Sequence, residues 1–250
     1  MDAPTPLFVT GMGRSGTTTA LRVLNTHPSV YLTGEVPLPV LRALFATLDA
    51  ADKAHVDTRD GWLSRKTDFM FDAFGFLSKG GEGRTHRRAT AGFRGFKEPR
   101  LEGMFADLES HFASVGLAPR YVYCARNPFD CWRSYKATSW NRHDEEGFLA
   151  AYVKSFAHLR AMRTAAPQRV AVISLDEVIA SGDPAKFYRD RLFSFLELHV
   201  PKRVAQHIER IANSERRSPY PALPPAERSA IEAFPGIAEI RAEYFTSSVY

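Results

Sequence analysis

Short apolar segments that alternate with helical patterns constrain the fold of this chain more than any other feature. A strand is indicated where a brief run is rich in β-branched or aromatic residues. The predicted strands are Leu7–Thr10, Val30–Leu32, Gly92–Phe96, Tyr121–Cys124 and Val170–Ile173. Such alternation predicts an α/β fold, in which about five parallel strands form one sheet flanked by helices on both faces. Ligands of such sheets bind beyond the carboxyl ends of the strands, so the residues just after each strand are the place to look for a site.

Apolar residues at helical spacing fill the intervals between the strands. The predicted helices are Thr17–Thr26, Pro39–Ala50, Trp62–Leu77, Leu101–Val115, Pro128–Thr138, Glu146–Ala165, Pro184–Leu198 and Val204–Asn213, followed by Ala226–Phe234 and Ile237–Phe245. The motifs described below draw on strands from both halves of the chain. We therefore expect a single domain that spans residues 1–250.

The composition narrows the classes of protein and of partner. Hydrophobic residues make up 44% and charged residues 24%, as in ordinary globular proteins. The net charge of +5 permits an anionic ligand, but this small surplus gives no reason to expect nucleic acid. We expect no signal peptide, no membrane span and a cytoplasmic location, with Cys124 and Cys131 as free thiols. The eight histidines show no metal-ligand spacing, so no metal site is expected.

The segment after the first strand reads Gly11-Met-Gly-Arg-Ser-Gly-Thr-Thr18, which nearly fits the phosphate-binding pattern G-x-x-x-x-G-K-[ST]. Glycines let the backbone wrap an oxyanion, and the N–H groups that begin the next helix point at it. Thr17 occupies the position of the lysine that reaches the terminal phosphates of a nucleoside triphosphate, and the basic residue stands earlier, as Arg14. The sequence therefore predicts a P-loop-like phosphate-binding loop and argues against ordinary ATP or GTP hydrolysis.

A second basic position follows the fourth predicted strand. Arg126 ends that strand, Pro128 opens a helix, and Ser134 comes two turns later. A phosphate with about two charges is best held by a fork-shaped donor, which the arginine guanidinium provides, and a serine hydroxyl adds a further donor. The alternative is that Arg126 pairs with Asp130 on the surface and Ser134 is an ordinary helix residue.

Both motifs resemble those of sulfotransferases that use 3′-phosphoadenosine 5′-phosphosulfate (PAPS). The lysine-free loop resembles the 5′-phosphosulfate-binding loop of that family, which implies that Arg14, Ser15, Gly16, Thr17 and Thr18 bind the donor there. The arrangement R-x-P-x-D-x-x-x-S resembles the family's 3′-phosphate motif, which implies the same role for Arg126 and Ser134. Family members often return a basic loop to the nucleotide, which suggests Arg216 and Arg217 as further 3′-phosphate ligands.

The resemblance also implies catalytic residues. The stretch Thr26-His-Pro-Ser-Val-Tyr-Leu-Thr-Gly-Glu35 is similar to one in protein-tyrosine sulfotransferases and bacterial relatives, where its glutamate is the proposed general base; here that residue is Glu35. The stretch Gly-Phe-Lys-Glu-Pro-Arg100 is similar to one whose lysine lies near the sulfonate, which implies that Lys97 stabilises developing charge together with Arg14. Glu98, His86 and His143 stay open as alternative bases.

The resemblance runs from residue 7 to about residue 220 and implies transfer of a sulfonate group from PAPS, with no metal, to a hydroxyl or amine. The resemblance does not identify the acceptor, which is a small molecule or a peptide. It also does not decide whether the protein forms a homodimer or what residues 78–95 and 225–250 do. One alternative is a nucleotide-dependent small-molecule kinase with the same loop. Another is a non-catalytic nucleotide-binding protein.

Overall fold

A computed structural model describes residues 3–55, 59–78, 90–139, 141–215 and 220–245. In this part of the chain, five parallel strands form one sheet in the order β2-β3-β1-β4-β5. The strands are β1 (Thr5–Thr10), β2 (Val30–Thr33), β3 (Phe93–Lys97), β4 (Arg120–Ala125) and β5 (Val170–Ser174). The predicted α/β fold with a parallel sheet is thus confirmed, and each strand end lies within two residues of its predicted position.

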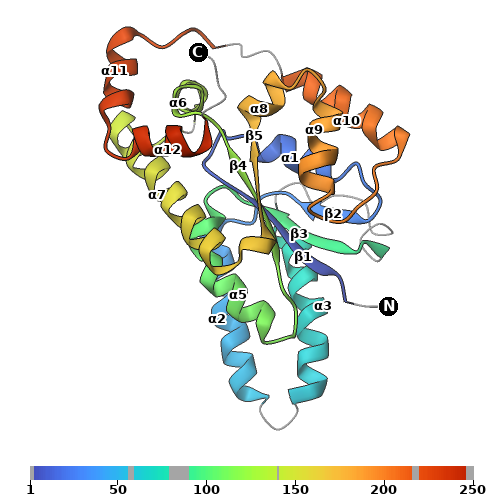
Figure 1. Cartoon of the computed structure of the whole chain (residues 1–250). Helices are drawn as coiled ribbons and strands as arrows, with labels where there is room; N and C mark the ends of the chain where they lie inside the picture. Colours follow the sequence, from blue (N-terminus) through green and yellow to red (C-terminus); the bar gives the residue numbers. More distant parts are fainter. Residues whose placement is uncertain (1–2, 56–58, 79–89, 140, 216–219, 246–250) are drawn as a thin grey trace.

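The two faces of the sheet bury different side chains because successive residues of a strand point to opposite sides. On β1, Leu7 and Val9 pack into one apolar cluster and Phe8 packs into the other. The first cluster lies under α1 (Thr17–Leu24), α9 (Pro184–Tyr188) and α10 (Lys202–Glu215). The second lies under α2 (Leu38–Ala54), α3 (Arg59–Leu77), α5 (Phe105–Ala113) and α7 (Glu145–Ala165). Figure 1 shows these two groups of helices on opposite sides of the sheet.

The remaining helices gather at the end of the sheet where the strands finish. They are α6 (Pro128–Lys136), α8 (Leu175–Ala180), α11 (Pro225–Ala233) and α12 (Ile237–Tyr244). In Figure 1, α6 and α8 both lie at the upper end of the sheet, where β4 and β5 lead into them. The connections after β1, β4 and β5 therefore meet at one edge, which is where a parallel sheet binds its ligands.

Two predicted helices are divided in the structure. Leu101–Val115 consists of a 3-10 turn, η2 (Leu101–Met104), followed by α5, because Arg100 has a left-handed backbone and the tight turn carries Glu102 into the interior. Pro184–Leu198 begins as α9 but widens into a π-helical turn, η4 (Arg189–Phe193). The sequence pattern also does not predict α8 as a separate helix. This helix ends at Ala180, two residues before Gly182, which has a left-handed φ of 69°.

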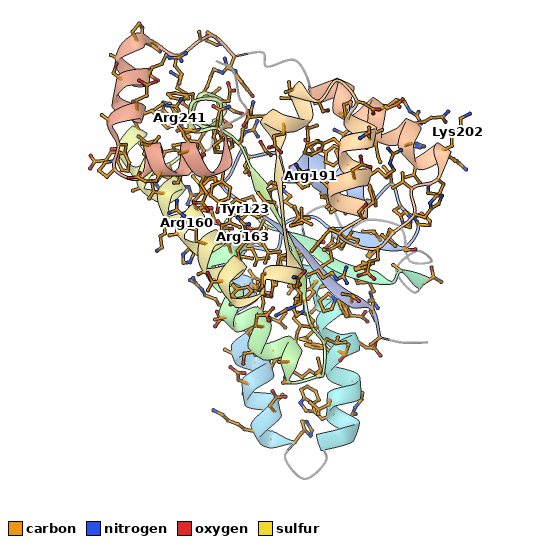
Figure 2. All side chains as sticks on the ribbon, in the orientation of Figure 1. Tyr123, Arg160, Arg163, Arg191, Lys202 and Arg241 are labelled. Atoms are coloured by element: carbon orange, nitrogen blue, oxygen red, sulfur yellow. The ribbon has the colours of Figure 1, made fainter. Side chains whose placement is uncertain are left out.

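Three features of the structure concern the expectations about thiols, surface charge and membrane spans. Cys124 and Cys131 are buried free thiols, and burial raises the pKa of each to about 12. Figure 2 shows Arg241 and Lys202 on opposite sides of the molecule, so these two cations do not share a patch. Among the described residues, no helix has the length and apolar character needed to cross a bilayer.

Candidate nucleotide and transfer site

The loop between β1 and α1 has a backbone that only glycine can adopt at its key position. Gly11 has a φ of 133°, and a Cβ atom there would lie 2.3 Å from the carbonyl oxygen of Cys124 on β4. Gly16, with a φ of 99°, precedes the first residue of α1. Arg14 also has a positive φ, 75°, which is costly for a residue with a side chain. The loop is therefore tightly wound, with an arginine at its turn.

The first turn of α1 is open to an anion. Its N-cap, Gly16, provides no side-chain hydrogen bond, and the turn contains no acidic residue. The N–H groups of an uncapped first turn carry partial positive charge and bind anions. The Ser15 hydroxyl is buried in the loop and has no hydrogen-bond partner within the described part of the chain. Thr17 is buried and Thr18 is exposed at the start of the helix.

The second motif contacts this loop directly. Arg14 Nε donates a hydrogen bond to Ser134 Oγ over 3.0 Å, and an Arg126 terminal N–H donates to the carbonyl oxygen of Arg14 over 3.2 Å. The Cys131 thiol donates to the carbonyl oxygen of Gly13 over 3.3 Å. The fold thus brings together residues that lie 112 to 120 positions apart in sequence.

Arg126 does not take the surface pairing that the sequence left open. Asp130 forms its ion pair with Arg133, one turn along α6, and its backbone N–H donates to the side chain of Asn127. Arg126 Nε is buried and has no hydrogen-bond partner among the residues that the structure describes. A guanidinium with an unused N–H and an uncapped helix on the adjoining loop form a set of donors suited to an anion.

Lys97 and Glu35 form an ion pair at the ends of neighbouring strands. Lys97 ends β3 and is 5% exposed, whereas the Glu35 side chain, in the segment after β2, is 41% exposed. The loop after β3 is attached to the phosphate loop, because the Arg100 N–H donates to the carbonyl oxygen of Gly11 over 2.9 Å. The pair and the phosphate loop therefore belong to the same end of the sheet.

The other candidate residues have different surroundings. Glu98 is partly buried beside Lys97 in sequence, and its backbone N–H donates to the carbonyl oxygen of Val9. The His143 ring stacks on Tyr135 of α6 with ring centroids 6.2 Å apart. Arg216, Arg217 and His86 lie outside the described residues. No group of three or more His, Cys, Asp or Glu side chains in the described ranges could hold a metal ion.

Glu102 is a buried carboxylate at the junction of β1 and η2, and the sequence pattern did not indicate its role. Glu102 of η2 accepts hydrogen bonds from the hydroxyls of Thr10 and Ser155, and Ser155 is 2.8 Å from the Tyr123 hydroxyl. Figure 2 shows Tyr123 in the interior, and burial raises its pKa well above the usual value. The network ties the end of β1 to η2 and α7. A glutamate inside an apolar helical pattern is the signal that sequence could have offered.

The first part of the chain matches a known family model, and the whole chain resembles solved structures in its fold. A sulfotransferase family model matches residues 6–94. The solved sulfotransferase domain of an olefin synthase from Synechococcus PCC 7002 has a TM-score of 0.57 at 17% identity, covering 100% of this chain and 98% of its own. A sulfotransferase from Mycobacterium avium has a TM-score of 0.55 at 15% identity, covering 98% and 78%. At these identities the structural likeness shows the fold alone. No curated protein sequence matches the chain.

Proposed function

We propose that this chain is a sulfotransferase and transfers a sulfonate group from PAPS to a hydroxyl acceptor; the family model that matches residues 6–94 and the fold shared with solved sulfotransferases support this proposal. The observation that carries the proposal is the convergence of Arg14, Ser134 and Arg126 beside the uncapped start of α1. The donor PAPS has phosphate groups at its 5′ and 3′ positions, and two separate sets of anion donors meet that requirement.

The donor is held from two sides in this proposal. The backbone N–H groups of residues 15–18 and the buried Ser15 hydroxyl bind the 5′-phosphosulfate, with Arg14 as the cation. Arg126 and Ser134 bind the 3′-phosphate, and Arg216 and Arg217 are further candidate ligands for it. The unused donors at Ser15 Oγ and Arg126 Nε support this assignment, because a buried polar group without a partner is costly until a ligand satisfies it.

Transfer is an in-line displacement at sulfur. The acceptor oxygen forms a bond to the sulfur atom as the bond from sulfur to the 5′-phosphate oxygen breaks, and PAP, adenosine 3′,5′-bisphosphate, leaves with the electron pair. Glu35 receives the proton of the acceptor hydroxyl. Lys97 and Arg14 stabilise the charge that develops on the sulfonate oxygens and on the leaving oxygen. The Glu35 side chain is 41% exposed although it pairs with Lys97, so an acceptor hydroxyl can reach its carboxylate, as a general base requires.

The proposal is tested first by ligand binding. PAP, ATP with magnesium, and adenosine 5′-phosphate are compared by thermal shift and by calorimetric titration. We expect PAP to stabilise the protein most, since only PAP places a phosphate at both subsites. Stabilisation by ATP with magnesium but not by PAP would contradict the proposal and favour a kinase.

Transfer is tested next with PAPS labelled in the sulfonate group. The acceptor panel contains phenols, tyrosine peptides, sugars, steroids and amines, and the protein with Glu35→Gln serves as the inactive control. We expect label on at least one hydroxyl acceptor with the unaltered protein. Tight PAP binding with no transfer to any acceptor would instead indicate a non-catalytic nucleotide-binding protein.

A further inference from the structure

The peptide bond that follows Arg126 is held by side chains on both of its polar atoms. Its carbonyl oxygen accepts a hydrogen bond from the Tyr152 hydroxyl of α7 over 2.7 Å. Its N–H, which belongs to Asn127, donates to Asp176 Oδ2 over 2.6 Å. Two helices that are remote in sequence thus fix the plane of one peptide, and that plane sets the direction in which the Arg126 side chain leaves the backbone.

Asp176 uses its second oxygen on the same residue. Asn127 Nδ2 donates to Asp176 Oδ1 over 2.6 Å, and the other side-chain atom of Asn127, Oδ1, accepts from the Asp130 N–H at the start of α6. Asn127 is 1% exposed, so these bonds lie away from water. Asp176 therefore holds both the turn after β4 and the N-cap of the helix that carries Ser134.

The turn that bears Asp176 also packs against the phosphate loop. A Cβ atom on Gly16 would lie 3.3 Å from the Leu175 side chain, so Leu175 lies directly over that glycine. Ser174, the last residue of β5, accepts a hydrogen bond from the Glu177 N–H and so caps α8. One short turn, residues 174–176, consequently contacts both nucleotide motifs, one through Leu175 and the other through Asp176.

The charge of Asp176 requires an explanation. A carboxylate near a phosphate-binding arginine weakens the attraction for phosphate, and burial raises the pKa of Asp176, against the opposing effects of the Asn127 hydrogen bonds and the Arg126 charge. An acid in this place therefore does not help by attracting the ligand. The two short hydrogen bonds to Asn127 are what it contributes, and they act on the geometry of Arg126.

We propose that Asp176, together with Tyr152, is a positioning residue that fixes Arg126 and so makes the site selective for nucleotides with a 3′-phosphate. This inference rests on the proposed function, because it assigns Arg126 to the 3′-phosphate. Neither Asp176 nor Tyr152 touches the ligand in this assignment. Their effect is on the affinity for PAP relative to adenosine 5′-phosphate, which lacks the 3′-phosphate.

The experiment measures both affinities by calorimetry, with melting temperatures, for Asp176→Asn and Tyr152→Phe. In the native protein, the backbone N–H and the side-chain Nδ2 of Asn127 each donate to one oxygen of Asp176. In Asp176→Asn, one of these two donors meets an amide NH₂ group, which cannot accept a hydrogen bond. We expect PAP affinity to fall about tenfold, as for the loss of a buried hydrogen bond to a charged group, with adenosine 5′-phosphate affinity unchanged. Tyr152→Phe removes only the hydroxyl and should shift the ratio in the same direction.

Asp183→Asn is the matched control, because Asp183 also accepts a backbone N–H, that of Lys186, but caps α9 and does not contact Asn127. Its affinity ratio should equal that of the unaltered protein. The inference would be overturned if the ratio of PAP affinity to adenosine 5′-phosphate affinity stayed unchanged in both Asp176→Asn and Tyr152→Phe. It would also be overturned if both affinities fell equally together with the melting temperature. If the unaltered protein does not prefer PAP, the proposed function fails first, which is visible before any variant is made.

Discussion

Lys97 and Glu35 are joined by an ion pair although they lie 62 positions apart, one at the end of β3 and the other just beyond β2. The pair combines a nearly buried cation with a carboxylate that is open to solvent. The Glu35 carboxylate is therefore accessible from solvent, whereas the Lys97 ammonium group is almost entirely covered. The roles proposed for the two residues, proton acceptance by Glu35 and charge stabilisation by Lys97, can therefore be tested one at a time.

Glu35→Gln is expected to remove proton acceptance and keep the size of the side chain. General-base catalysis contributes about 10²- to 10⁴-fold, so kcat should fall by that order while PAP affinity stays the same. Steady-state kinetics with labelled PAPS and calorimetry with PAP measure the two quantities. Glu209→Gln, on the exposed side of α10, is the control. A kcat close to that of the unaltered protein would remove Glu35 as the base and direct attention to Glu98.

Lys97→Met is expected to remove the cation and retain most of the apolar length. Since the proposed role of Lys97 is to stabilise charge in the transition state, kcat should fall by about 10²- to 10³-fold with little change in PAP affinity. The same two measurements apply. An unchanged kcat would place Lys97 outside the reaction, and a loss of PAP affinity alone would make it a nucleotide ligand.

Arg126→Ala is expected to weaken PAP binding much more than binding of adenosine 5′-phosphate, because the variant loses the bidentate contact that we propose to the 3′-phosphate. Arg126→Lys keeps the charge and loses the fork, so its PAP affinity should lie between those of Arg126→Ala and the unaltered protein. Isothermal titration with both nucleotides measures the difference. Equal losses for the two nucleotides would contradict the assignment.

Asp52→Ala is expected to destabilise the packing of α2 against α3. Lys66 is 0% exposed, and its ammonium group donates to Asp52 over 2.6 Å and to Ser114 over 3.0 Å. Removing Asp52 leaves a buried charge without its ion-pair partner, which costs about 3 kcal/mol. Lys66→Met replaces the charge with an apolar side chain and should cost less. Urea denaturation measures both, and the reverse order of stability would refute the argument.

His111 is expected to make stability depend on pH. Burial lowers its pKa below the ordinary value of 6.5, although Asp49, Asp52 and Asp107 oppose the effect and Lys66 adds to it. The unfolded chain therefore takes up a proton first as the pH falls, so the stability present above pH 6.5 decreases until the pH passes the folded-state pKa. The loss of unfolding free energy between about pH 7.5 and 5.5 should be smaller in His111→Phe, whose ring can still stack on Phe45.

The fold could be predicted from sequence because its signals are local. Each strand is a short apolar run, and the loop with Gly11 and Gly16 follows the first strand directly. Prediction fails where distant contacts override local pattern. Glu102 turns inward to Thr10, which helps to separate η2 from α5, and nothing in the helical spacing of residues 101–115 contains that information.

The candidate site was predictable only in part for the same reason. Arg14 and Arg126 follow strands and Lys97 ends one, so their residue types and positions in the sequence are enough to indicate a site. The hydrogen bond from Arg14 to Ser134 spans 120 positions, and no local pattern predicts it. The sequence around Asp176 indicates only scaffold, because the role of this residue depends on the peptide after Arg126, which it meets only in three dimensions.

The turn at residues 174–176 also affects the order in which the protein can become competent to bind its donor. A ribosome completes the phosphate loop first and the Arg126 turn about 110 residues later, but the side chains that fasten both motifs come from β5 and α8. A nascent chain that ends before Ser174 already contains Arg14, Arg126, Ser134 and Tyr152 but lacks Leu175 and Asp176. We therefore expect the proposed donor binding to begin only after β5 and α8 have been synthesised.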